Sequence, residues 1–145
     1  MSSDLILPVA IALVALAACL FALIRGGLPE RLTAGLFLLS IPLALLLQKI
    51  PSDQKSMAQL GIDALFALIS LALTLRYPIR WLGVVMLLYA AQFALHAAYM
   101  VADRPADALH QAANNLIFAG IVLCLTIGTL GAQARRRAAG PAEAA

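Results

Sequence analysis

Five apolar segments occupy almost all of this 145-residue chain, and the pattern indicates that each crosses a lipid bilayer. A hydrocarbon core about 30 Å thick requires about 20 residues of helix, whereas helices of soluble cores are usually shorter and striped with charge. Short polar or proline-containing connections separate the five segments, which are residues 5–24, 32–47, 57–75, 81–102 and 108–132. The pattern therefore predicts an integral membrane protein with five transmembrane helices.

The composition excludes a water-soluble domain. Hydrophobic residues make up 63% of the chain, charged residues only 12%, and the mean hydropathy is +0.96. In lipid, every backbone polar group must find its partner within the protein, and the short connections leave no room for a soluble lobe. We therefore expect an all-α helical bundle in a single domain, residues 1–132, followed by a basic and disordered cytoplasmic tail at residues 133–145.

The positions of lysine and arginine predict the orientation of the chain. Short loops rich in these residues stay on the cytoplasmic side. With the N-terminus outside, seven basic residues lie inside (Arg25, Arg31, Arg76, Arg80, Arg135, Arg136, Arg137) and three lie outside (Lys49, Lys55, Arg104). This distribution favours an N-out, C-in topology. The net charge of +3 is then a topology signal that also brings the chain into contact with membrane lipids, and no nucleic-acid partner is expected.

The first segment contains a sequence similar to a lipoprotein processing site, Leu-Ala-Ala-Cys at residues 16–19. Three features disfavour processing: no basic residue precedes the segment, the apolar run continues to Ile24, and Arg25 closes its far end. Cys19 is therefore expected to be an ordinary small buried residue. Neither Cys19 nor Cys124 has the spacing of a metal or redox motif.

Polar residues inside segments three, four and five form the candidate site. Residues 89, 92, 96 and 99 follow spacings of three, four and three, which places them on one face of a helix. The short hairpin at 103–107 brings segments four and five side by side, with both histidines at similar depth, and segment three carries an acid in its first turns. The candidate polar cluster comprises Asp63, Gln92, His96, His110 and Asn114.

Two interpretations of the polar cluster are open. A charged group at the bilayer centre costs about 2.5 to 3.5 kcal/mol, so Asp63 should face the bundle. Under the first interpretation the cluster forms interhelical hydrogen bonds that fix packing. Under the second, Asp63, His96 and His110 line a functional cavity, because carboxylates and imidazoles serve proton relays, metal centres and haem ligation. No cofactor is required by the pattern, but the two histidines could hold a haem b, or with Asp63 a metal ion.

Several short motifs resemble those of a known group of proteins. They are Gly-Leu-Pro-Glu-Arg at 27–31, Asp63, Leu-Thr-Leu-Arg at 73–76 followed by Arg80-Trp81, His96, and Ile-Gly-Thr at 127–129. Together they resemble small uncharacterised multi-spanning membrane proteins of alphaproteobacteria, over most of residues 26–130. The resemblance implies the bacterial inner membrane as location and carries no activity with it.

The sequence contains no catalytic signature of the common enzyme classes. We therefore expect an integral inner-membrane protein of unassigned molecular function that is a structural or accessory component, in a larger membrane complex or a homo-oligomer, rather than an enzyme. The alternative is a small proton-, metal- or haem-linked transport or redox protein that uses the polar cluster.

Overall fold

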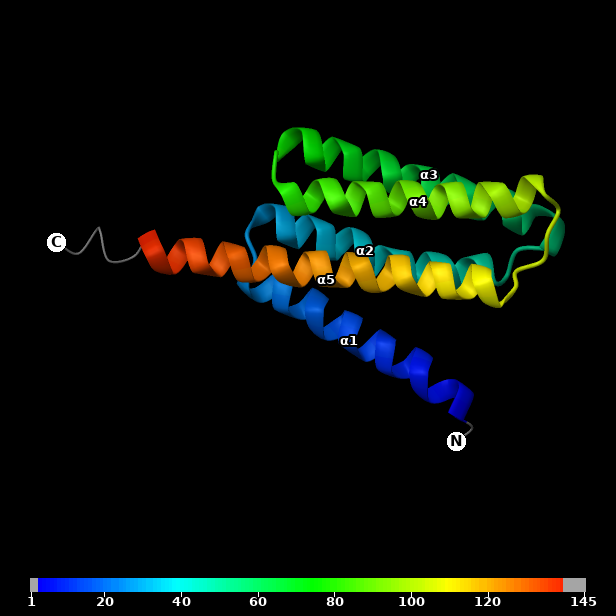
Figure 1. The fold of residues 1–145 in the computed structure, drawn as a ribbon, viewed down its shortest axis with the longest axis horizontal. Helices are drawn as coiled ribbons and strands as arrows, with labels where there is room; N and C mark the ends of the chain where they lie inside the picture. Colours follow the sequence, from blue (N-terminus) through cyan, green and yellow to red (C-terminus); the bar gives the residue numbers. More distant parts are fainter. Residues whose placement is uncertain (1–2, 140–145) are drawn as a thin grey trace.

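A computed structural model of the protein describes residues 3–139, and in this range the chain is a bundle of five α-helices with no strand (Figure 1). The helices are α1 (Ser3–Arg25), α2 (Leu28–Leu47), α3 (Ser52–Arg76), α4 (Arg80–Val101) and α5 (Ala108–Ala139). Each coincides with one of the five apolar segments, so the all-α helical bundle is confirmed. In Figure 1, α2 to α5 lie side by side along the long axis, and α1 is inclined to them.

Among the residues whose side chains the structure describes, four helices are long and apolar enough to cross a membrane: α2, α3 from Gln54 onward, α4 and α5. In α1 the apolar stretch described in this way is Ala10–Arg25. Large apolar side chains cover the outer surface of the bundle; Leu68 is 63% exposed and Leu116 is 75% exposed. An apolar perimeter of this extent suits lipid rather than water, because soluble monomers rarely expose large contiguous apolar patches.

The connections between the helices define two ends of the bundle (Figure 1). The α1–α2 and α3–α4 connections lie together with the C-terminal part of α5 at one end, which we call the arginine-rich end. This end carries the seven arginines predicted to share one side, whereas Lys49, Lys55 and Arg104 lie at the opposite, hairpin end, with the α2–α3 and α4–α5 connections. The bundle therefore separates the basic residues seven to three along its axis.

The last helix is longer than the sequence indicates. We expected a disordered tail from residue 133, but α5 continues to Ala139, and residues 140–145 lie outside the described range. Alanine and arginine are strong helix formers, and basic side chains in a last turn interact favourably with the helix dipole. Arg136 also donates a hydrogen bond to the carbonyl of Gly26, over 3.2 Å. This contact ties the end of α5 to the α1–α2 connection.

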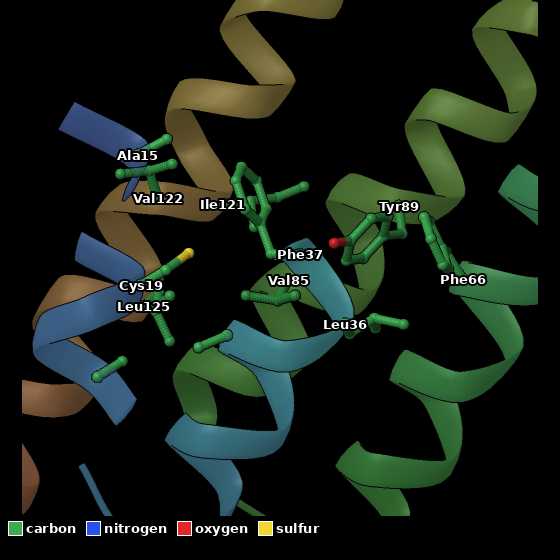
Figure 2. Packing of buried hydrophobic residues seen from close by; sticks show 12 residues of the cluster. Ala15, Cys19, Leu36, Phe37, Phe66, Val85, Tyr89, Ile121, Val122 and Leu125 are labelled. Carbon is green, nitrogen blue, oxygen red and sulfur yellow. The ribbon is translucent and has the colours of Figure 1, made fainter. Parts of the chain in front are cut away.

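The apolar core lies where α1, α2 and α4 meet α5 (Figure 2). Small residues on one face of α1, including Ala15 and Cys19, are almost fully buried, and in Figure 2 they lie beside Val122 and Leu125 of α5. Small side chains let two helices approach closely, which is the usual way that membrane helices pack. Cys19 is 0% exposed, so the prediction that it is a small buried residue is confirmed.

Candidate functional site

A cleft of about 870 Å³ extends from the hairpin end into the bundle, between α2, α3, α4 and α5. Its mouth is lined by charged residues, among them Lys55, Asp103 and Arg104. Its middle is polar, and its inner part is lined by apolar and aromatic side chains. The five residues of the predicted polar cluster, Asp63, Gln92, His96, His110 and Asn114, all line this one cleft.

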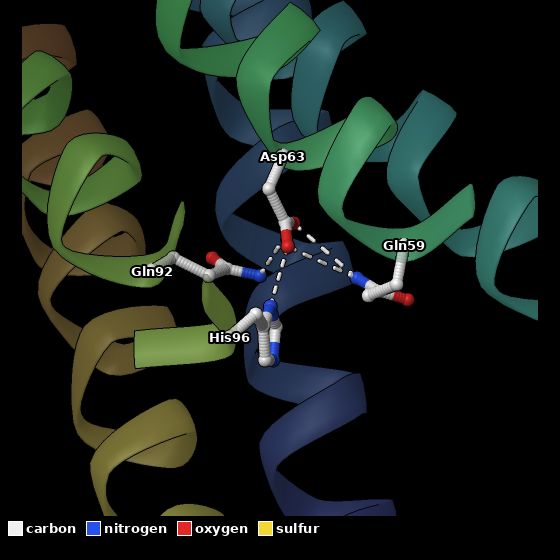
Figure 3. Close-up of polar contacts among 4 residues, drawn as sticks. All are labelled: Gln59, Asp63, Gln92 and His96. Carbon is white, nitrogen blue, oxygen red and sulfur yellow. Dashed lines mark hydrogen bonds and ion pairs between the residues drawn. The ribbon is translucent and has the colours of Figure 1, made fainter. Parts of the chain in front are cut away.

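Asp63 is the centre of the polar part of the cleft (Figure 3). Its side chain is 2% exposed, and one carboxylate oxygen contacts Nδ1 of His96 on α4, an ion pair when the imidazole is protonated. Gln59, one turn earlier on α3, donates to the carboxylate over 3.3 Å, and Gln92 of α4 donates over 3.5 Å. Helical spacing explains this convergence: Gln59 and Asp63, and likewise Gln92 and His96, are four residues apart and share a face.

The other two members of the polar cluster lie on α5, at the opposite wall of the cleft. The ring of His110 contacts that of His96, with centroids 5.0 Å apart, and the ring of Tyr99, with centroids 4.6 Å apart. Asn114 follows His110 by one turn and lines the same wall. Its neighbour Asn115 is exposed on the outer surface of the bundle. The structure thus places the two histidines, which the sequence put at similar depth, in direct ring contact.

Four aromatic residues, of which the sequence singled out only Tyr89, form the inner part of the cleft. The rings of Phe37 and Phe118 have centroids 4.6 Å apart, and those of Phe66 and Tyr89 have centroids 5.7 Å apart. Tyr89 is 3% exposed, and within residues 3–139 its hydroxyl has no hydrogen-bond partner; Figure 2 shows it directed toward Phe37. A buried hydroxyl without a partner costs about 1 to 3 kcal/mol. The cleft therefore holds a polar group that the protein itself does not satisfy.

Asp107 stabilises the rim of the cleft as the N-cap of α5. One of its carboxylate oxygens accepts hydrogen bonds from the backbone N–H of His110, over 2.8 Å, and from the Tyr99 hydroxyl, over 2.7 Å. These two donors, first the backbone N–H and then the hydroxyl, hold the pKa of Asp107 below its usual value. The contacts fasten the α4–α5 hairpin across the side of the cleft that carries both histidines.

The N-cap formed by Asp107 predicts that the stability of the α4–α5 hairpin decreases at low pH. Because the pKa of Asp107 is depressed in the folded protein, its stabilising contribution is present above the unfolded pKa, about 3.9, and is lost as the pH falls through the lower folded value. Asp107→Asn keeps a good N-cap without the charge. The difference in thermal midpoint between wild type and this variant in detergent should therefore shrink between pH 6 and pH 3. Asp103→Asn, at an exposed neighbouring position, should show no such trend, and a constant difference for Asp107→Asn would contradict the assignment.

The arrangement of the histidines bears on the metal and haem hypotheses. Among the residues that the structure describes, no group of three or more His, Cys, Asp or Glu side chains is placed so that it could hold a metal ion. The rings of His96 and His110 are in contact, and this arrangement leaves no space for a macrocycle between them. A metal- or haem-linked role stays a hypothesis from the sequence. The contact that the structure shows in the polar part of the cleft is the one between Asp63 and His96.

Fold and site together define the class of the molecule: a helical bundle in which four helices of the described part are long and apolar enough to cross a membrane, with a polar cleft between α2, α3, α4 and α5. Comparison of the chain with protein-family models, with curated proteins and with solved structures finds no match. The chemistry of the cleft is therefore the basis for a functional assignment.

Proposed function

We propose that this protein is a multi-pass protein of the bacterial inner membrane that binds a small molecule in the cleft, with the Asp63–His96 pair exchanging a proton as the ligand enters and leaves. One observation carries the proposal: a carboxylate that is 2% exposed contacts a histidine in the middle of a cleft of about 870 Å³. Ligand sites typically measure about 300 to 1,000 Å³ and combine apolar walls with a few convergent polar groups.

The energetics of the pair favour a functional role over packing alone. Interhelical hydrogen bonds between uncharged side chains contribute about 0.6 kcal/mol each, and amides such as those of Gln59 and Gln92 supply them without a charge. A carboxylate within the membrane costs about 2.5 to 3.5 kcal/mol, and such residues commonly mark ligand or proton pathways. The unpartnered hydroxyl of Tyr89 in the same cleft adds a second group that a ligand would satisfy. Both features favour a ligand-binding role of the cleft over packing alone.

For the orientation, we propose that the hairpin end faces the outside and the arginine-rich end faces the cytoplasm, with the N-terminus out and the C-terminus in. The seven-to-three separation of basic residues supports this topology. The cleft then opens toward the external side. A ligand would reach Asp63 from the external side of this membrane or from its outer leaflet.

Adjacent asparagines on α5 offer a direct test of the cleft and of its orientation. Asn114 lines the cleft, whereas Asn115 at the same depth is exposed on the outer surface of the bundle. In a background with both native cysteines replaced by alanine, we expect Asn114→Cys to react with a membrane-impermeant methanethiosulfonate reagent added to intact spheroplasts. Asn115→Cys should not react, because a thiol facing lipid does not ionise to the reactive thiolate.

Each alternative gives a different labelling pattern. Reaction of the Asn114→Cys variant in inverted vesicles but not in spheroplasts would reverse the orientation and keep the cleft. No reaction from either side, in a protein that remains folded, would mean that the polar cluster is closed and serves packing. That result would remove the proposed ligand-binding function.

A further inference from the structure

We infer that the ligand of the cleft is a lipophilic organic cation, whose positive charge takes the place of protonated His96 beside Asp63. This inference rests on the proposed ligand-binding function and names the chemical class of the ligand. It follows from three features of the cleft: a buried carboxylate beside aromatic rings, a counter-ion that can give up its charge, and an opening toward the apolar perimeter.

The first feature is the combination of an acid and aromatic faces. Asp63 is 2% exposed and shares the cleft with five aromatic rings, those of Phe37, Phe66, Tyr89, Tyr99 and Phe118. A carboxylate supplies the opposite charge, and the negative faces of aromatic rings attract cations. A carboxylate beside aromatic rings is the combination that recognises ammonium groups with apolar substituents. An anionic ligand would instead meet Asp63 as a like charge.

The second feature is that His96 can lose its charge whereas a lysine or arginine could not do so readily. Without a ligand, protonated His96 neutralises the charge of Asp63. When a cation binds to Asp63, His96 releases its proton through the cleft to solvent, so that the net charge of the site is unchanged. The other ionisable groups facing His96 are His110 from α5 and Tyr99 from α4 itself, while the charges at the mouth are Lys55 of α3 and Asp103 and Arg104 of the α4–α5 connection. The residues of α2 that line the cleft, Phe37, Ser40, Ala44 and Leu47, are all uncharged.

The third feature is the route by which such a ligand enters. Ala44 of α2 and Met57 of α3 both line the cleft, and both are exposed on the outside of the bundle, Met57 at 68%. The cleft therefore reaches the apolar perimeter between α2 and α3 as well as the hairpin end. A molecule with an apolar body can enter from the lipid at this place and carry its charge to Asp63.

Tetraphenylphosphonium is a suitable probe, because its charge does not change with pH and only the protein can titrate. Isothermal titration of the full-length protein in detergent should show binding that releases one proton, seen as a dependence of the heat on the buffer. The affinity should rise by about tenfold per pH unit while His96 is protonated, as linkage to a single proton requires. Neutral triphenylphosphine oxide and anionic tetraphenylborate should bind at least about tenfold more weakly, the equivalent of one lost charge contact.

Variants separate the roles of the two residues. Asp63→Asn should abolish the preference for the cation. His96→Gln should still bind tetraphenylphosphonium but without proton release or pH dependence between pH 6 and 8, which keeps the test valid if Asp63→Asn does not fold. Asn115→Gln, at an exposed position outside the cleft, is the control and should retain proton release.

The inference is overturned by equal or tighter binding of tetraphenylborate, or by proton release that persists in His96→Gln. Failure of all three probes to bind, with the Asn114→Cys variant still labelled, would exclude the cation class but leave the ligand-binding cleft in place. An unlabelled cleft would remove the proposed function as well.

Discussion

Replacement of Asp63 by leucine should lower the free energy of unfolding by about 3 to 5 kcal/mol, the usual cost of removing one partner of a buried ion pair. Asp63 is 2% exposed and His96 is 14% exposed, so water screens their contact poorly. The variant also leaves the amide groups of Gln59 and Gln92 without their acceptor. Thermal or denaturant unfolding in detergent measures the loss.

The double variant Asp63→Leu/His96→Leu should lose less than the sum of its two single variants, with a coupling energy of about 0.5 to 3 kcal/mol. Thermal or denaturant unfolding of the wild type, the two single variants and the double variant under one condition measures this coupling.

Asn115→Leu provides the control, because Asn115 is exposed on the outer surface of α5, where an apolar side chain suits the lipid. This substitution should be neutral or stabilising at every pH. Additive effects of the two single variants at Asp63 and His96 would show that the two residues contribute independently. Their contact would then have no energetic meaning, and the functional interpretation of the pair would lose its basis.

The sequence predicted the helices well because the physical requirement for them is simple. A backbone in lipid must form its hydrogen bonds within each segment, so every long apolar run becomes a helix that ends at glycine, proline or a charged residue. The end of α5 shows the limit of this reasoning. Hydropathy stops at the first arginine, but helix propensity does not, and the Arg136 contact with Gly26 becomes visible only once α5 lies beside the α1–α2 connection.

The candidate site was predictable in part for the same reason. Charged and amide side chains are rare in membrane helices, so Asp63, Gln92 and His96 stand out, and their helical spacing indicates that they face the bundle. The aromatic part of the cleft was not predictable. A phenylalanine such as Phe66 looks the same in sequence whether it faces lipid or the interior, and only the packing of α3 against α4 places it beside Tyr89.

Gly128 is the second position at which a single substitution should have a large effect. A Cβ atom at Gly128 would lie 2.5 Å from the indole ring of Trp81, closer than atoms can approach without displacement. Gly128→Ala should therefore destabilise the bundle by about 1 to 3 kcal/mol, as overpacking does, and Gly128→Leu by more. The packing of Trp81 on Gly128 of α5 gives this side chain a role in joining α4 to α5. Thermal unfolding in detergent measures both variants.

Helix propensity alone predicts that Gly128→Ala stabilises the protein, whereas the contact with Trp81 predicts that it destabilises the protein. The measured change in stability therefore distinguishes the two effects. Alanine in the middle of a helix is favoured over glycine by about 0.5 to 1 kcal/mol. Gly61→Ala should show this gain, because nothing lies within 4 Å of its added Cβ. In Gly128→Ala the steric cost should exceed the gain, and Trp81→Leu in the same chain should recover part of the loss by making room for the methyl group. A stabilised Gly128→Ala variant would mean that α4 and α5 pack less closely at this point than the structure shows.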